Sequence, residues 1–443
     1  MKTNKIQTEL SDLEKKGLRR KLRKITRVSA RECVLDGKHC IDFSSNNYLA
    51  LADDPRIVEE SINWTRKFGA GSGASRLISG TLAEYSELEE RIAAWKNSEA
   101  ALIVGSGYLA NIGIIPALTG REWAIFADKL NHNSLVNACL LSRSEFHRYA
   151  HNDIKNLNEI VMRQIFDVAA PACPAVASLR RRMPGAPMAS TPLCQGYEGQ
   201  VAVATTNATP KTDALHEILE KSESKNKMLV SDTVFSMDGD LADIDGIANF
   251  AEKTGALVYL DEAHATGVFG KKGEGLAGNL KGSNVITMGT FSKALGSYGA
   301  YVSCSREIKE YLINKCQTFI YSTALPPAVF GAISAAVELV QTPEFSQKRT
   351  DLLKKSAFLA SEINKIGFET GKTGSPIIPV IIGGNKEVLR ISQFLLDKGI
   401  FAVAVRPPTV PEGSARLRIS LNCAHNGEDT SRLLEVLQTC KQL

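Results

Sequence analysis

Short apolar runs alternate with helix-length segments over the central part of the chain. Runs rich in β-branched or aromatic residues predict buried strands at 101–106, 122–128, 227–232, 256–262, 284–290 and 299–305. Between two of them, residues 244–254 have the length and apolar spacing of a helix. Strand–helix alternation of this kind predicts an α/β fold with a mostly parallel central sheet covered by helices.

The pattern changes after about residue 327. Helical segments at 328–339, 350–366 and 385–398 alternate with apolar runs at 375–384, 401–411 and 415–422. These segments predict a smaller C-terminal α/β domain with an antiparallel sheet. We therefore expect an N-terminal arm or helix at 1–45, a large domain at 46–327 and a small domain at 328–443.

One segment fits neither pattern. Residues 161–214 contain six of the 16 prolines and show no sustained helix or strand period. Such composition is typical of a surface loop or a disordered insertion. Its flanks resemble the two halves of one ordinary helix and connection, so we expect an insertion at the surface, away from any site.

Composition and charge exclude several function classes. A formal net charge of +5 is too small to indicate a nucleic-acid partner. The N-terminal segment carries acidic residues without an apolar core behind it, and no stretch is long and apolar enough to predict a membrane span. Nine scattered cysteines without a C-x-x-C pair predict neither disulfides nor a zinc site. We expect a cytoplasmic protein that needs no metal.

Candidate chemistry lies at the carboxyl ends of the predicted strands, where ligands collect in such sheets. One strand ends at Thr290, and Ser292 and Lys293 follow in a glycine-flanked turn. Lys293 is either an exposed charge or a nucleophilic amine that forms a Schiff base with an aldehyde cofactor. The hydroxyl groups of Thr290 and Ser292 would suit a phosphate.

Another predicted strand carries Asp261 at its carboxyl end, and His264 follows after a turn. A buried carboxylate is costly unless it is paired, and one suitable partner is a protonated pyridine nitrogen. His264 would then reach the phenolate oxygen of the same ring. The alternative is that Asp261 caps a helix.

Two further segments add weaker indications. The run GSGYLANIG at 105–113 is a glycine-rich turn that opens a helix, and its free backbone N–H groups would favour a phosphate. His132 lies in a loop after a predicted strand, where an isolated histidine more often has a structural role than a functional one.

Together these motifs resemble the α-oxoamine synthases, which are pyridoxal 5′-phosphate (PLP) enzymes of fold type I. The resemblance runs from about residue 17 to the C-terminus, outside 161–214. Its motifs, in order, are SGYLAN, the HNS of 132–134, VFSMDGD (234–240), DEAHATG (261–267) and TFSKALG (290–296). It implies a large domain with a mostly parallel central sheet and a smaller C-terminal α/β domain.

The resemblance implies a role for each matching residue. Lys293 corresponds to the Schiff-base lysine, and Asp261 to the partner of the pyridinium nitrogen. His264 lies near the phenolate oxygen, and His132 stacks over the ring. The other cofactor contacts are Gly107, Tyr108, Ser236 and Thr290.

The family condenses an amino acid with an acyl thioester and releases carbon dioxide, through an external aldimine and a quinonoid. The stretch 404–421 most closely resembles the members that use L-alanine and a pimeloyl thioester, carried by CoA or by acyl carrier protein, in biotin synthesis. On that match Thr409 contacts substrate, and Arg418, in preference to Arg416, holds the amino-acid carboxylate. Arg19 contacts the acyl-CoA, and the members are homodimers with the site at the interface.

Alternatives remain at this point. The chain could use glycine and form 2-amino-3-ketobutyrate or 5-aminolevulinate, or it could be a non-catalytic relative that acts as a binding subunit. Asp232 stands where relatives commonly have Glu, which could alter the reach of the carboxylate. The run 15–27 holds eight basic residues and no acidic one, so it is either a solvated face or a docking surface for an anionic, phosphate-bearing ligand.

Overall fold

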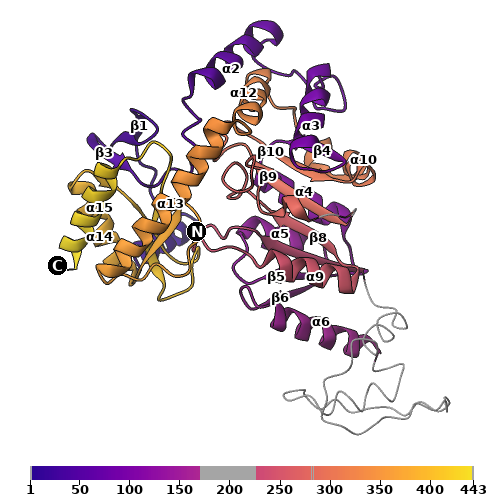
Figure 1. Cartoon of the computed structure of the whole chain (residues 1–443). Coiled ribbons are helices and arrows are strands. Elements are labelled where there is room, and N and C mark those ends of the chain that lie inside the picture. Colours follow the sequence, from indigo (N-terminus) through magenta and orange to yellow (C-terminus); the bar gives the residue numbers. More distant parts are fainter. Residues whose placement is uncertain (1, 170–225, 281, 283, 442–443) are drawn as a thin grey trace, which may run out of the picture.

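A seven-stranded sheet forms the centre of the larger part of the molecule (Figure 1). The computed structural model describes residues 2–169, 226–280, 282 and 284–441. In spatial order the strands are β4 (Ala100–Val104), β10 (Ala300–Cys304), β9 (Val285–Thr290), β8 (Leu257–Asp261), β7 (Asn226–Asp232), β5 (Trp123–Asp128) and β6 (Glu145–Tyr149). Strand β10 runs antiparallel to both neighbours, whereas the other neighbouring pairs are parallel. The predicted α/β fold with a mostly parallel sheet is confirmed.

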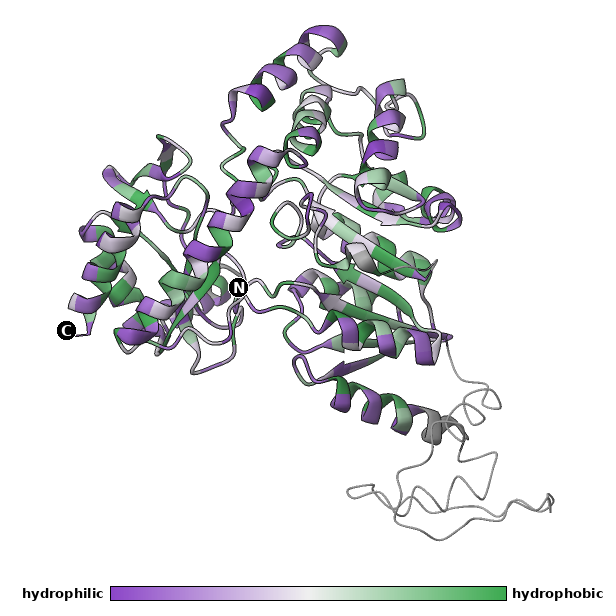
Figure 2. Ribbon diagram, in the orientation of Figure 1, coloured by the Kyte–Doolittle hydropathy of each residue, from purple (hydrophilic) through white to green (hydrophobic). Residues whose placement is uncertain are grey.

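Alternating side chains of each strand supply two cores, one on each face of the sheet. In β7, Met228 and Val230 pack in one core and Leu229 packs in the other. The first core includes helices α4 (Gly107–Leu118), α5 (Asn133–Leu141) and α10 (Arg306–Lys315). The second includes α6 (Ile154–Ala169) and α9 (Ile244–Thr254). Because both faces are covered, the inner strands are largely apolar, as Figure 2 shows.

Further helices cover the β4 end of this sheet. They are α2 (Pro55–Phe68), α3 (Ala83–Trp95), the short α11 (Gln317–Ile320) and α12 (Pro327–Leu339), with a 3₁₀ turn at Ala277–Asn279. Tyr85 of α3 stacks on Phe330 of α12 with ring centroids 3.4 Å apart, and both side chains are buried. This packing brings a helix from late in the chain onto the N-terminal half of the fold.

The smaller part contains two sheets and three helices (Figure 1). One sheet is antiparallel, with β11 (Ile377–Gly383), β14 (Ala415–Ser420) and β13 (Val403–Val405) in that order. The other joins β1 (Ile25–Arg27), β2 (Glu32–Leu35) and β3 (Lys38–Asp42) to β12 (Ile400–Phe401), which pairs with β3 in parallel. The helices are α13 (Pro343–Lys365), α14 (Asn385–Asp397) and α15 (Gly427–Cys440), and α1 (Lys2–Lys15) begins the chain.

Two helices extend clearly beyond the predicted bounds. Helix α13 begins at Pro343, earlier than the expected start at residue 350, because the Thr342 side chain caps it by accepting from Phe345 N. Helix α6 continues past Val161 to Ala169, so the segment 161–214 begins as a helix whose Val161 is buried in the core. The rest of that segment lies outside the described residues.

None of the helices in the described ranges combines the length and apolar character that crossing a membrane requires.

Candidate active site

A cavity of about 430 Å³ lies between the carboxyl ends of the central strands and the smaller part of the molecule. The structure places six of the sequence-predicted site residues around it: His132, Ser236, His264, Lys293, Thr409 and Arg418. Their positions differ by up to 286 residues along the chain, taking 418 − 132. The strand ends and the loop after β13 therefore bring these six predicted site residues together around one cavity.

Asp261 ends β8 and lies just behind the cavity wall, with only 4% of its surface exposed. Its Oδ1 accepts from Ala263 N at 2.9 Å, which fixes the start of the following turn. Its Oδ2 accepts from Asn111 Nδ2 at 2.8 Å. Asp261 is thus a buried carboxylate oriented by two hydrogen bonds, which is an expensive arrangement unless a partner uses it.

Asn111 of α4 connects Asp261 to His132, and no role was predicted for this residue from the sequence. Its Nδ2 also donates to Ser134 Oγ at 2.8 Å, and its Oδ1 accepts from Tyr259 Oη at 2.8 Å. Ser134 Oγ in turn lies 2.7 Å from His132 Nδ1. Burial, opposed by Asp261 and reinforced by Lys293, lowers the pKa of His132, so its ring is neutral at neutral pH.

Lys293 lies in the turn after β9 and is partly buried on the cavity wall. The turn is fixed by Phe291 N, which donates to Gly299 O at 3.0 Å, and by Gly296, whose φ is +66°. A Cβ at Gly296 would lie 2.3 Å from Ala52 N, so this close approach requires glycine. Burial lowers the pKa of Lys293 to about 8, the nearby Asp261 carboxylate opposing this and the Arg418 charge reinforcing it.

His264 is buried and lines the cavity. Its Nδ1 lies 2.7 Å from Tyr48 Oη. Burial, together with the charges of Lys293 and Arg418, moves the pKa of His264 well below its ordinary value, so the ring is neutral. When Tyr48 donates to Nδ1 rather than to Asn46 Oδ1, 3.1 Å from its hydroxyl, the ring proton lies on Nε2, which can then donate into the cavity.

Arg418 is a buried arginine of β14 that reaches the cavity. It donates to Ser236 O at 2.6 Å, Asn46 Oδ1 at 3.0 Å, Ser420 Oγ at 2.7 Å and Tyr48 Oη at 3.4 Å. All four partners are neutral, and Arg418 makes no ion pair with a carboxylate among the residues that the structure describes. Arg416 is engaged instead by Asp238. This difference supports the choice of Arg418 as the group that holds a substrate carboxylate.

Gly107 and Thr290 lie side by side next to this region. Gly107 is the first residue of α4, and a Cβ there would lie 2.7 Å from Thr290 Cγ2. Tyr108 is exposed, and its hydroxyl accepts from Asn137 Nδ2 at 3.0 Å. The residues therefore form an open helix N-terminus whose backbone N–H groups suit a phosphate.

Arg20, rather than the predicted Arg19, reaches the cavity. Arg20 lines it and donates from Nη2 to Thr409 Oγ1 at 3.3 Å. Arg19 is exposed and pairs with Glu14 at 3.1 Å. Arg406 also lines the cavity and donates to Gly17 O. This hydrogen bond holds the basic run 15–27 at the mouth of the cavity.

Two short segments carry site residues. The His132 turn (residues 128–132) follows β5, and the Ser236 loop (residues 235–241) follows β7. Asp232, at the end of β7, accepts from His132 N at 2.7 Å. In this chain, therefore, the aspartate at that position reaches the backbone of the His132 turn.

Comparisons with known proteins agree on the class of fold and on the family. The model of the aminotransferase class I and II family matches residues 38–167 and 191–437. The 8-amino-7-oxononanoate synthase of Geobacter metallireducens is 39% identical over 433 residues, covering 97% of this chain and 96% of the relative. The chain belongs to the 8-amino-7-oxononanoate synthase family.

Solved structures add the fold. A structure of SPT with PLP has 25% sequence identity and a TM-score of 0.80, covering 100% of this chain and 98% of that chain. The 8-amino-7-oxononanoate synthase of Francisella tularensis has 23% identity and a TM-score of 0.66, covering 91% of this chain and 98% of that chain. The expected fold type I is thereby confirmed.

Proposed function

We propose that the chain is a PLP-dependent acyltransferase that condenses L-alanine with a pimeloyl thioester to 8-amino-7-oxononanoate, a step of biotin synthesis. One observation carries the proposal. A lysine with a lowered pKa, a buried carboxylate and an arginine bound to neutral partners converge on one cavity. Family membership supplies the choice of product.

The residues present fit PLP. The buried Asp261 carboxylate, already oriented by Asn111, would hold the ring nitrogen, and His132 would cover the ring. The N-terminus of α4 at Gly107, beside Thr290, would hold the phosphate. When bound, PLP supplies an aldehyde that reacts with amines and a ring that accepts an electron pair.

The chain's own groups perform the remaining tasks. Because its pKa is about 8, Lys293 is part amine and part ammonium near neutral pH and can both take and return a proton at Nζ. Arg418 would orient the amino-acid carboxylate through a charge-assisted pair. His264, held neutral with its Nδ1 on Tyr48, would donate a hydrogen bond from Nε2.

The basic run 15–27 supports an anionic thioester carrier. Its side chains are largely exposed, and Arg20 and the Arg406 contact to Gly17 place it at the cavity mouth. Coenzyme A and acyl carrier protein both present phosphate charge, which such a rim attracts. Raising the salt concentration should therefore raise the KM for the thioester, and Arg20→Ala should weaken that dependence.

We also infer a cytoplasmic homodimer. Several large side chains with apolar surface are exposed in the single chain, among them Leu77, Ile78, Tyr108, Tyr298 and Tyr321. Burying them against a second copy would remove apolar surface from water. The seven cysteines of the described residues are free thiols, which is typical of a reducing compartment. Sedimentation of the purified protein tests the dimer.

The decisive assay offers alanine, glycine or serine with pimeloyl thioesters of CoA and of a carrier protein. Product is expected from alanine; product only from glycine with acetyl-CoA or succinyl-CoA, offered in parallel, would favour the synthesis of 2-amino-3-ketobutyrate or 5-aminolevulinate. Lys293→Ala should abolish both turnover and the visible absorbance of bound PLP, whereas the exposed Lys253→Ala should change neither. Turnover retained in Lys293→Ala would refute the assignment.

A further inference from the structure

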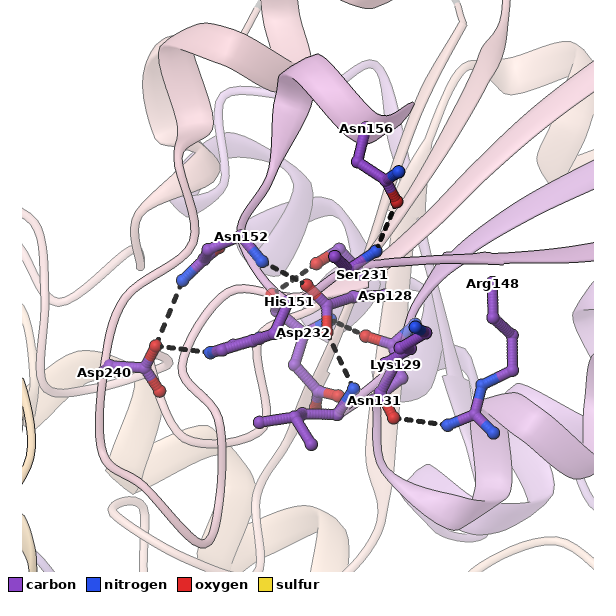
Figure 3. Close-up of polar contacts among 12 residues, drawn as sticks. Asp128, Lys129, Asn131, Arg148, His151, Asn152, Asn156, Ser231, Asp232 and Asp240 are labelled. Carbon is purple, nitrogen blue, oxygen red and sulfur yellow. Dashed lines mark hydrogen bonds and ion pairs between the residues drawn. The ribbon is translucent and has the colours of Figure 1, made fainter. Parts of the chain in front are cut away.

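A histidine that the proposed chemistry does not use lies between two carboxylates beneath the site (Figure 3). His151 follows β6, and its Nδ1 lies 3.0 Å from Asp128 Oδ1. Its Nε2 lies 2.7 Å from Asp240 Oδ2. Asp128 ends β5 and Asp240 lies in the Ser236 loop, so the three residues, here called the clamp, join three separate segments.

The clamp carries a positive charge on its central ring. Burial lowers the pKa of His151, but the hydrogen bonds and charges of Asp128 and Asp240 outweigh this and raise the pKa to about 10. Both ring nitrogens face carboxylate oxygens, so both carry protons and donate. The Phe235 ring packs edge-on against the imidazole at 4.4 Å and shields one side of it.

Asp128 holds the His132 turn. Its side chain, which is fully buried, accepts from Leu130 N at 2.7 Å and from Asn152 N at 2.8 Å. Asn131 in the same turn donates to Val230 O and accepts from Asp232 N, at 2.8 and 3.0 Å. The position of His132 therefore depends on a turn that begins at Asp128.

Asp240 holds the Ser236 loop. Its backbone oxygen accepts from Phe235 N at 3.0 Å, and its Oδ2 accepts from Asn152 Nδ2 at 3.0 Å. Ser236 and Met237 of this loop line the cavity, and Ser236 O accepts from Arg418. The Oδ1 atom of Asp240 is buried and has no hydrogen-bond partner in the described structure, so the charge of His151 is what balances this carboxylate.

We propose that His151 is a positioning residue that sets the distance between the His132 turn and the Ser236 loop. The inference rests on the proposed function, because these two segments carry His132 and the Ser236 carbonyl that orients Arg418. His151 itself does not line the cavity and touches no reacting group. Loss of its charge would leave two facing carboxylates and would drive the two segments apart.

The test is His151→Gln, which keeps an amide donor and removes the charge. We expect kcat/KM for alanine to fall roughly tenfold to a hundredfold, mainly through a higher KM. The reason is that a small displacement of Arg418 weakens its binding to the alanine carboxylate. Hydrogen exchange should become faster in 129–136 and 234–242, with or without PLP, while β8 stays unchanged.

His147→Gln is the matched control. The side chains of His147 and His151 are both 26% exposed. His147 stacks on Phe126, and the carboxylate that it faces belongs to Glu145 of its own strand, at 2.9 Å. His147→Gln should leave both the kinetic constants and the hydrogen exchange of the two segments unaltered. Asp240→Asn retains the Asp128–His151 pair and leaves no facing carboxylates, so it should weaken the link to the Ser236 loop less than His151→Gln does, and the double variant should lose no more than His151→Gln alone.

The outcomes separate the two proposals. Unchanged hydrogen exchange in both segments of His151→Gln would overturn the positioning role. A KM for alanine equal to that of the wild type would overturn it as well. A uniform rise of exchange over all strands with normal kinetic constants would also overturn it, because it would indicate stability alone. Hydrogen exchange needs no substrate, so it tests the positioning role of the clamp even if the wild-type protein fails to condense alanine. Such a failure would refute only the proposed function.

Discussion

Replacement of Asn111 by leucine offers a quantitative test of the hydrogen-bond chain behind the cavity. Leucine has the same branched arrangement of side-chain heavy atoms as asparagine, but its methyl groups are larger and it has no polar atoms. The substitution would remove three bonds of 2.8 Å each, to Asp261 Oδ2, Ser134 Oγ and Tyr259 Oη. At most 4% of the surface of any of these three partners is exposed, so water cannot replace the lost bonds.

The expected cost follows from the types of bond. Each of the two neutral bonds contributes about 1 kcal/mol, and the bond to the Asp261 carboxylate contributes about 1.5–3 kcal/mol. Together the free energy of unfolding should fall by about 4 kcal/mol. The Asp261 carboxylate would also lose the group that orients it, so the dissociation constant of PLP should rise.

Urea unfolding of the protein without PLP, followed by tryptophan fluorescence, measures the stability change. Asn314→Leu is the control, because Asn314 is exposed on α10 and, within the described part of the chain, its Nδ2 donates to Glu310 O alone, at 2.8 Å. It should stay within about 0.5 kcal/mol of the wild type. A decrease in the free energy of unfolding of less than about 1 kcal/mol for Asn111→Leu would refute the reasoning. It would mean that the three buried partners do not need the hydrogen bonds of this side chain.

Three further results are expected. Glu262→Gln should reduce the free energy of unfolding by about 3–5 kcal/mol, because Lys96, 5% exposed, would become an unpaired buried cation. Gly107→Ala should lower the affinity for PLP, measured by absorbance titration, because its methyl group would lie 2.7 Å from Thr290 Cγ2. The pKa of His151 is raised from 6.5 to about 10, so its stabilising contribution is complete below pH 6.5 and lost as pH rises through 10. Urea midpoints of wild type and His151→Gln should therefore converge toward pH 10.

Matched controls exist for these variants. Gly71→Ala adds a methyl group with nothing within 4 Å and should leave PLP affinity unchanged. The double variant Lys96→Met with Glu262→Gln should recover much of the lost stability, since no buried charge remains. Equal stability of single and double variants, or midpoints of wild type and His151→Gln that differ by the same amount at every pH, would contradict the respective argument.

The sequence predicts the strands of the central sheet and the positions of its chemistry well, because both follow from local pattern. The apolar run at 256–262 became β8, and its last residue, Asp261, lies behind the cavity as strand direction requires. Helix 244–254 has the predicted bounds. The antiparallel direction of β10 was not predictable, since a run of apolar residues carries no information about direction.

The missed site residues depend on contacts between distant segments. Asn111 lies within a motif that the sequence singled out, yet its bond to Asp261 joins residues 150 positions apart. Arg19 and Arg20 are adjacent basic residues, and only the fold decides which one faces the cavity. The short strands β1 to β3 contain too few alternating apolar residues to stand out from the basic run that precedes them.

The parallel pairing of β3 with β12 has a consequence for how the chain reaches its folded state. The sheet formed by residues 25–42 remains incomplete until residues 400–401 have been synthesised. During synthesis the edge of β3 is therefore exposed while nearly all the remaining chain is made, and unpaired strand edges promote association between chains. Closing so long a loop is entropically slow, so we expect the smaller part to become resistant to proteases only after the central sheet has formed.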